Sequence, residues 1–214
     1  MLTITTPASN LLLLTAEQLR VAAGLPDDDT SQDDDLEETG LRVASDIATA
    51  CKVAVGASKP PTLLQETLTE RLRDVCRDVI ILSRRHDVEI TSVVADGTTL
   101  SASDYEVEPE SGLLYRLSGE SRVGWYATLV TIVYKAGFVD VPSDLAGAAS
   151  DLMRLRLSEG DRDPLVKGET IEIPDVETRR TDYWVGGMPG SGSDGPVPAT
   201  ILGKLSRYMN YTAG

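Results

Sequence analysis

Apolar side chains recur at the spacing of one helix face in three segments of the chain, 16–23, about 34–55 and about 144–158. Each segment is flanked by residues that start or stop helices: capping-box side chains, acids at an N-terminus, or glycines past the last turn. These flanking residues are Thr15, Gln18 and Gly24 for the first segment, Gly56 for the second, and Pro142, Ser143 and Gly160 for the third. The pattern therefore predicts three helices.

Between the second and third predicted helices, over about 62–138, runs rich in β-branched and aromatic residues alternate with turn signals. From Val79 onward these runs predict a meander of hairpins, in which Asp96 and Gly97 form the sharpest turn. Residues 62–76 are ambiguous, because leucines four residues apart fit a helix face while the intervening polar residues also fit an alternating strand. We expect the region as a whole to form an inserted antiparallel β-structure.

The C-terminal part of the chain changes character twice. Residues 168–185 predict an extended arm, which Pro174 restricts to an edge strand or an exposed excursion. Residues 186–198 are mostly Gly, Pro and Ser, a composition typical of a flexible tether. Residues 199–214 predict a short amphipathic helix that buries its apolar face on a partner or folds back onto its own domain. The apolar positions of this face are Ile201, Leu202, Leu205, Tyr208, Met209 and Tyr211.

A chain of 214 residues with 41% hydrophobic content supports one domain, which we place at 1–185. We expect an α+β fold, with a small helical core, an inserted antiparallel β region and an extended C-terminal arm. The formal net charge of -14 repels a phosphate backbone and argues against nucleic-acid binding. Cys51 and Cys76 lack disulfide or zinc spacing, so both are expected in the core. The apolar run Leu11–Leu14 is too short for a signal or a membrane span, which predicts a protein made in the cytoplasm.

No combination of residues predicts an enzyme or a cofactor site. The single histidine, His86, lies in the sequence Ser-Arg-Arg-His-Asp, which indicates a solvated loop. A small enzyme that uses His86 with Arg85 and Asp87 is the weaker of two alternatives. The other is a calcium-binding interaction module, because the acidic run Asp27–Glu38 has oxygen-bearing side chains at the ligand positions of a twelve-residue calcium loop. However, Gln32 stands where the bend of such a loop requires glycine, which favours a solvated acidic loop and helix start.

Several motifs follow one another in an informative order. They are T-A-E-Q-L-R-V at 15–21, D-D-D-L-E at 33–37, DGTTLSASDYEVEPESGLLYRL at 96–117, TIVYKAGF at 131–138, V-P-S-D-L at 141–145, and the C-terminal arm with its apolar end. Each motif is weak alone, but together they cover most of 15–211. In this order the chain resembles the head-tail adaptor family, also called connector or head completion proteins, of long-tailed phages and gene transfer agents.

The resemblance implies a structural protein of the virion neck, assembled in the host cytoplasm, whose copies form a dodecameric ring between the portal and the next neck or tail component. It favours strands for residues 62–82. It implies that the six apolar residues of 199–214 named above dock on the portal. It also implies a hairpin that contacts neighbouring subunits or the tail-side partner through Tyr105, Leu113, Leu114 and Tyr115. A bore lined by carboxylates would repel phosphates, so DNA could pass without specific binding.

Overall fold

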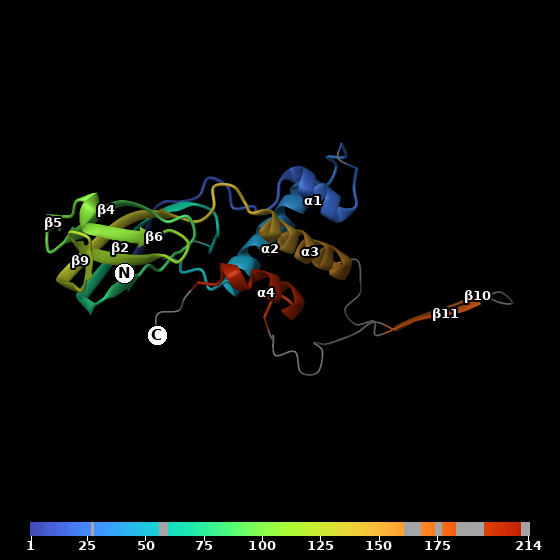
Figure 1. Cartoon of the computed structure of the whole chain (residues 1–214). Coiled ribbons are helices and arrows are strands. Elements are labelled where there is room, and N and C mark those ends of the chain that lie inside the picture. The colour runs from blue at the N-terminus through green and yellow to red at the C-terminus, as the bar shows by residue number, and fades with distance from the viewer. Residues whose placement is uncertain (27, 56–59, 161–167, 174–176, 183–194, 211–214) are drawn as a thin grey trace.

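The structure is a computed structural model that describes residues 1–26, 28–55, 60–160, 168–173, 177–182 and 195–210. A helical unit and a β-unit lie side by side, and a two-stranded hairpin extends from the helical side, away from the β-unit (Figure 1). Two separate hydrophobic clusters correspond to the two units. The expected α+β fold, with a β region inserted between helices, is therefore confirmed.

The helical unit consists of α1 (Ala16–Ala23), α2 (Asp33–Ala50), α3 (Ser143–Gly160) and α4 (Ala199–Leu205). The first helix has the predicted bounds, and both bonds of the Thr15 capping box are formed. Helices α1, α2 and α3 contact one another, and α4 packs on α3. The first three helices come from the predicted segments, whereas α4 comes from the C-terminal segment predicted as a short amphipathic helix.

Helix α2 ends earlier than the sequence pattern indicated. The predicted range reached residue 55, but the chain turns at Lys52, whose φ is 55°. The amide of Val53 then donates to the carbonyl of Ala48 at 3.0 Å. Val53 lies past the helix end but is still buried. Its apolar side chain therefore extended the periodicity from which the longer helix was predicted. The predicted stop signal, Gly56, lies outside the described residues.

The β-unit contains two antiparallel sheets. The five-stranded sheet has the order β1-β2-β9-β4-β5, with bounds Leu2–Thr6, Glu66–Arg77, Trp125–Ala136, Glu89–Ala95 and Thr98–Thr99. The other sheet has the order β3-β7-β6, with bounds Val79–Ile81, Leu113–Ser118 and Tyr105–Glu108, and β8 (Ser121–Val123) also pairs with β7. Side chains from both sheets share one hydrophobic cluster. The ambiguous residues 62–76 therefore contribute to a strand, as the resemblance favoured, while the sequence pattern did not predict β1.

The turn between β4 and β5 is the one that the sequence signalled most strongly. Asp96 and Gly97 both have positive φ, 46° and 83°, as expected for a two-residue hairpin turn that matches the twist of its strands. The amide of Leu129 on β9 donates to the Asp96 carboxylate at 2.9 Å. This bond ties the turn to the neighbouring strand.

The predicted extended arm contains a hairpin of β10 (Gly168–Ile173) and β11 (Glu177–Asp182), which pair antiparallel from Gly168 opposite Asp182 to Ile173 opposite Glu177. In the described part of the chain, no other strand pairs with either of them. Residues 183–185 of the arm and most of the predicted tether, 186–194, lie outside the described residues. At the end of that tether, Val197 is buried in the helical core, so this part is packed.

A buried ion pair lies where the two units meet. The side chains of Arg84 and Glu66 are 3% and 2% exposed, and their nitrogen and oxygen atoms are 2.8 Å apart. Arg84 also donates to the backbone carbonyls of Ala54 and Thr62. Burial lowers the pKa of Arg84, while the negative charge of Glu66 opposes this shift. Because each charge satisfies the other, removal of either one is expected to be strongly destabilising.

Gly137 supplies a second constraint at this junction. Its φ is 101°, and its amide donates to the carbonyl of His86 at 2.8 Å. A Cβ atom at this position would lie 2.5 Å from the Leu64 carbonyl oxygen, which belongs to the backbone and cannot rotate away. The close approach of the two segments therefore requires glycine.

We expect Gly137→Ala to lower the free energy of unfolding by about 3 kcal/mol or more, through left-handed strain and backbone overlap together. Gly97→Ala is the matched control, since its φ is also positive but nothing lies within 4 Å of the added Cβ. It should cost about 1 kcal/mol. Urea unfolding of both variants measures the difference, and equal losses would contradict a steric role for Gly137.

Candidate functional site

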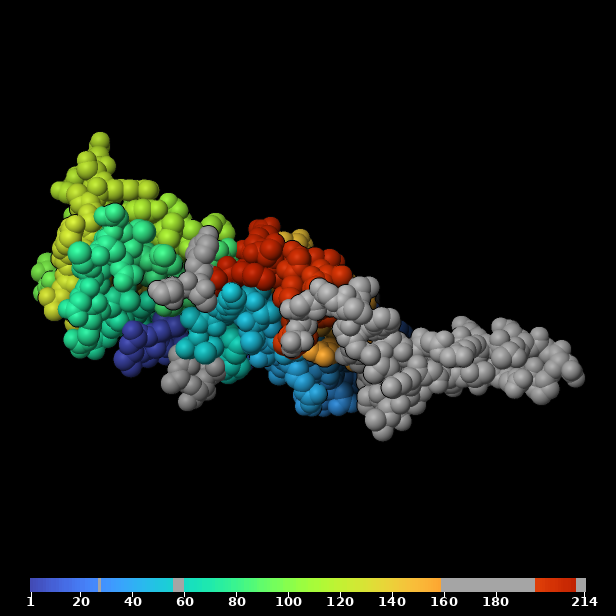
Figure 2. Space-filling view, turned by 90° about the horizontal axis from the view of Figure 1, so that it is seen from below, coloured from blue at the N-terminus to red at the C-terminus, as the bar shows by residue number. Residues whose placement is uncertain are grey.

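The C-terminal segment, residues 195–210, packs on the helical unit and forms the candidate interaction site. It comprises α4 and the following 3-10 turn, η2 (Ser206–Tyr208). Figure 2 shows the segment in red lying against the helices, next to α2 in blue. Its buried apolar side chains join the core of the helical unit, and they are Val197, Ile201, Leu205 and Tyr208. The segment is therefore an integral part of the fold.

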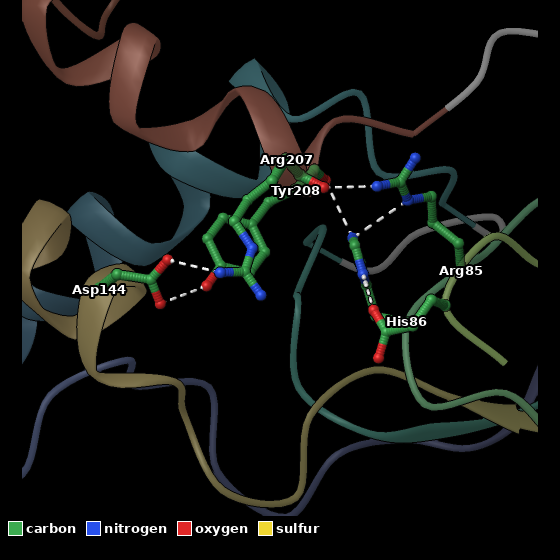
Figure 3. Close-up of polar contacts among 6 residues, drawn as sticks. Arg85, His86, Asp144, Arg207 and Tyr208 are labelled. Carbon is green, nitrogen blue, oxygen red and sulfur yellow. Dashed lines mark hydrogen bonds and ion pairs between the residues drawn. The ribbon is translucent and has the colours of Figure 1, made fainter.

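Polar contacts align the segment along α3. The Tyr208 hydroxyl donates to Asp144 Oδ1 at 2.5 Å, and Arg207 Nη1 lies 3.2 Å from Asp144 Oδ2 (Figure 3). About two turns further along the helix, Lys204 Nζ lies 2.6 Å from Asp151. The hydrogen bond from Tyr208, with the charge of Arg207, lowers the pKa of Asp144. Burial, followed by the bond to Asp144, raises the pKa of Tyr208.

The segment also contacts the backbone at the end of α2. The amide of Asn210 donates to the carbonyl of Cys51 at 2.8 Å. Carbonyls at a helix C-terminus have no partner within the helix, so this bond satisfies one of them. The observed end of α2 is thus stabilised by residues more than 150 positions away in the sequence.

Three aromatic rings meet where the segment reaches the junction of the two units. The ring of His86 stacks on Phe138 with 5.1 Å between the ring centroids. Tyr208 makes edge-to-face contacts with both rings, with centroid distances of 5.7 Å to His86 and 5.6 Å to Phe138. His86 is 3% exposed, so the expectation of a solvated loop was wrong. The reason is tertiary, because residues 122 positions later return and cover the loop.

His86 joins the loop to the C-terminal segment through its ring nitrogens. Its Nε2 lies 3.2 Å from Arg85 Nε and 3.4 Å from the backbone carbonyl of Tyr208 (Figure 3). Its Nδ1 lies 3.7 Å from the Glu110 carboxylate. Arg85 also donates to the carbonyl of Arg207 on the segment. Burial, and next the charge of Arg85, lower the pKa of His86 and favour the neutral ring.

Within the described residues, the structure assembles neither of the alternative sites that the sequence left open, and Asp27, the first residue of the acidic run, lies outside them. Asp87 is exposed while His86 is buried among aromatic rings, so the enzyme alternative has no common accessible centre. In the acidic run, α2 already begins at Asp33, and this carboxylate binds Arg20 at 2.6 Å. Within the described residues, no three His, Cys, Asp or Glu side chains form a group that could hold a metal.

The two cysteines differ in environment. Cys51 is completely buried, as expected, and burial raises the pKa of its thiol to about 12. Cys76 on β2 is exposed, so its expected place in the core was wrong. The strand alternates there, with Val75 buried and Cys76 on the other face.

The six predicted portal-docking residues fall into three groups. Ile201, Leu205 and Tyr208 are buried in the chain's own core, with Leu205 at 0% exposure. Leu202 and Met209 are half-buried, and Tyr211 lies outside the described residues. Of the two arrangements that the sequence allowed, the structure therefore shows the one in which the tail folds back onto its own domain.

The predicted contact hairpin exists as β6 and β7, but its residues are not equivalent. Leu114 is 0% exposed in the core of the β-unit, where the indole nitrogen of Trp125 donates to its carbonyl. It is therefore unavailable to a neighbouring subunit. Tyr105, Leu113 and Tyr115 are half-buried, and contact through them stays a prediction.

The sequence pattern did not single out Tyr126 on β9, whose side chain is largely solvent-exposed. It is 77% exposed, whereas its neighbour Trp125 is buried. The alternation of a strand could have identified this difference. In the described part of the chain, no helix is long and apolar enough to cross a membrane.

Leu205→Ala should lower the free energy of unfolding by about 2–5 kcal/mol, because it leaves a cavity between the segment and the helical core. Lys204→Ala, on the exposed side of the same helix, removes only a surface ion pair and should cost less than about 1 kcal/mol. Denaturant unfolding compares the two. Similar small effects would show that the segment contributes little to the fold.

His86 should make stability depend on pH. The pKa of His86 in the folded state lies below its ordinary value of 6.5. The stability that the neutral ring contributes is therefore fully present above pH 6.5 and is lost as the pH falls through the folded-state pKa. We expect His86→Phe, which keeps a ring in place, to flatten the stability profile between about pH 7 and 5, by at most about 1.4 kcal/mol per pH unit. Urea unfolding across this range measures both slopes, and parallel profiles would contradict the assignment.

Comparison with known proteins places the fold. No protein-family model and no curated protein matches the chain. Among solved structures, a chain described as "Neck of empty GTA particle computed with C6 symmetry" matches with a TM-score of 0.57 and 16% identity, covering 100% of this chain and 97% of that one. A chain from "Neck of native GTA particle computed with C12 symmetry" matches with a TM-score of 0.47 and 15% identity over the same shares. The chain thus has the fold of a protein from the neck of a gene transfer agent (GTA) particle.

Proposed function

We propose that this chain is a structural head-tail adaptor of a phage-like particle, which forms a ring between the portal and the next neck or tail component. The observation that carries the proposal is the fold shared over the whole chain with a protein of a GTA neck. A shared fold alone does not fix function. The motif order in 15–211 independently resembles adaptor proteins, so sequence and fold support the same role.

In a ring of twelve copies, the number that the resemblance implies, the negative charge of the chain would act on DNA in the bore. The formal charge of -14 per subunit is repeated around such a ring. The same helical turns of α2 that carry the exposed acids Asp34, Asp35 and Glu37 contain no basic residue. A bore lined by such side chains would repel DNA and allow its passage.

Docking of the C-terminal segment on the portal is also part of the proposal, under a constraint that the structure adds. The buried face of α4 contributes to the subunit core, so docking through Ile201 or Leu205 requires the segment to leave its place. Each such side chain gains about 1.5–3 kcal/mol by burial, which a portal surface would have to replace. Weak single contacts can still suffice, because anchors on one ring bind together.

Among the described residues, no observation favours the enzyme or calcium alternatives over this role. His86 packs between aromatic rings, and Asp33 of the acidic run binds Arg20. We therefore propose a non-enzymatic protein that acts through its surfaces.

Mass measurement of the chain alone, and of its mixture with the portal of the same particle, tests the proposal. We expect a ring of about twelve copies bound to the portal, the number that the resemblance implies. Failure of the two proteins to associate at any stoichiometry would contradict the adaptor role.

Single substitutions test the docking segment without removing its core residues. Leu202→Ser changes a half-buried residue of α4 and should weaken portal binding by about tenfold or more, since the loss is repeated at every anchor. Val139→Ser is the matched control, as Val139 is 69% exposed outside the segment. Equal affinities of the two variants would show that the segment does not contact the portal.

A further inference from the structure

One face of the five-stranded sheet packs against neither hydrophobic cluster in the described part of the chain. Its apolar residues Val94, Leu129 and Val133 are half-buried, and none of them belongs to the core of the helical unit or of the β-unit. The alternate residues of β9, such as Val130 and Ile132, point the other way, into the core of the β-unit. We call the uncovered surface the outer sheet face.

Arginines line one side of the outer sheet face. Arg71 and Arg73 on β2 are both exposed, and they lie opposite Thr131 and Leu129 of β9. Residues directly opposite each other in an antiparallel pair have their side chains on the same face, so both arginines belong to the outer sheet face. Neither arginine forms an ion pair with another described residue.

The acids near this face do not neutralise the arginines. Glu89 lies on the face, but its carboxylate binds Lys135 on the neighbouring strand at 3.1 Å. Asp74 and Asp96 line a hollow with Tyr126 at the end of the sheet, and neither forms an ion pair with the arginines. The outer sheet face is therefore positively charged, although the chain has a formal net charge of -14.

Helix α2 exposes a surface of opposite charge. Asp34, Glu37, Glu38 and Leu41 occupy positions i, i+3, i+4 and i+7, so they share one side of the helix. All four are exposed, and Leu41 is 37% exposed although it is a large apolar residue. Glu38 pairs with Arg42 of the same helix, whereas Asp34 and Glu37 have no ion-pair partner within the described ranges.

The two surfaces match in chemistry and in shape. This side of α2 presents carboxylates beside a leucine, and the outer sheet face presents guanidinium groups beside leucine and valine. In layered folds a helix commonly covers the apolar face of a sheet. Opposite charges across an interface select the partner and fix the register. The phosphates of duplex DNA could bind the arginines but would leave the apolar side chains uncovered, so the face favours a protein.

We propose that this side of α2 in one copy packs on the outer sheet face of the next copy, with its carboxylates next to the arginines and Leu41 next to Leu129. Within one chain, α2 lies in the helical unit, beside the β-unit (Figure 1). The contact therefore joins two copies head-to-tail, and its repetition can close a ring. The inference rests on the proposed ring and assigns it an interface. Asp34 and Glu37 would then face a neighbour, which leaves Asp35 among the three acids named for the bore.

An exchange of charges tests the contact. Arg73→Glu and Glu37→Arg, each alone, bring like charges together and should weaken self-association at least about tenfold. An equimolar mixture of the two variants should associate about as well as the wild type, because each new charge meets its opposite at one contact and the native pair forms at the next. Arg154→Glu changes an exposed arginine of α3 by the same charge and should have no effect.

Analytical ultracentrifugation of the full-length chains at low salt, where exposed ion pairs are least screened, measures these associations. Circular dichroism verifies that all variants are folded.

The apolar part of the contact has its own test. Leu41→Ser should weaken association about tenfold, because the leucine is no longer buried by the neighbouring sheet. Val123→Ser is the matched control, since Val123 has nearly the same exposed fraction, 38%, but lies in the other sheet. Equal association of the two variants would contradict burial of Leu41 between copies.

The outcomes separate this interface from the adaptor role. If rings form from Arg73→Glu and from Glu37→Arg as readily as from the wild type, the contact is wrong while the ring remains. If both variants associate weakly and their mixture is no better, α2 is not the occupant of the outer sheet face. If the wild type binds a duplex oligonucleotide and Arg73→Glu abolishes that binding, the face takes phosphates and the pairing between copies is overturned. A wild-type chain that stays monomeric with and without the portal overturns the contact and the ring together.

Discussion

The buried ion pair between Arg84 and Glu66 is the interaction on which the arrangement of the two units depends. The guanidinium bonds a carboxylate of the β-unit and two backbone carbonyls, those of Ala54 and Thr62, next to the helical unit. A buried charge is tolerated only when such partners satisfy it. The pair thus links the end of α2, the start of β2 and the loop after β3 in one arrangement. The close contact of Gly137 with the Leu64 backbone further restricts how the two units can lie relative to each other.

The C-terminal segment uses the surface that this junction creates. Phe138 and His86 lie at this junction, and Tyr208 packs against their rings. Asp144 at the start of α3 then binds both Tyr208 and Arg207. The last described residues are consequently coupled to both units, and a partner that removed the segment would expose an aromatic cluster and the end of α2. This coupling links the stability of the subunit to any docking by its C-terminus.

Two further features lie outside the packed core. Acidic side chains are frequent at the start of α2, and the β10–β11 hairpin extends beyond the body (Figure 1). The fold that carries both features is shared with a protein from the neck of a GTA particle.

Local chemistry in the sequence is enough to predict several of the elements. The Thr15 capping box and Gly24 set the bounds of α1, Asp96 and Gly97 set the β4–β5 turn, and apolar spacing identified α4 as a helix. Which surfaces these elements cover depends on contacts between residues that are distant in the sequence. His86 is buried because Tyr208 returns from 122 residues away, and α2 ends early where Asn210 meets Cys51. The same apolar face of α4 could have bound a partner or its own core, because periodicity specifies a face to be buried but not the surface that buries it.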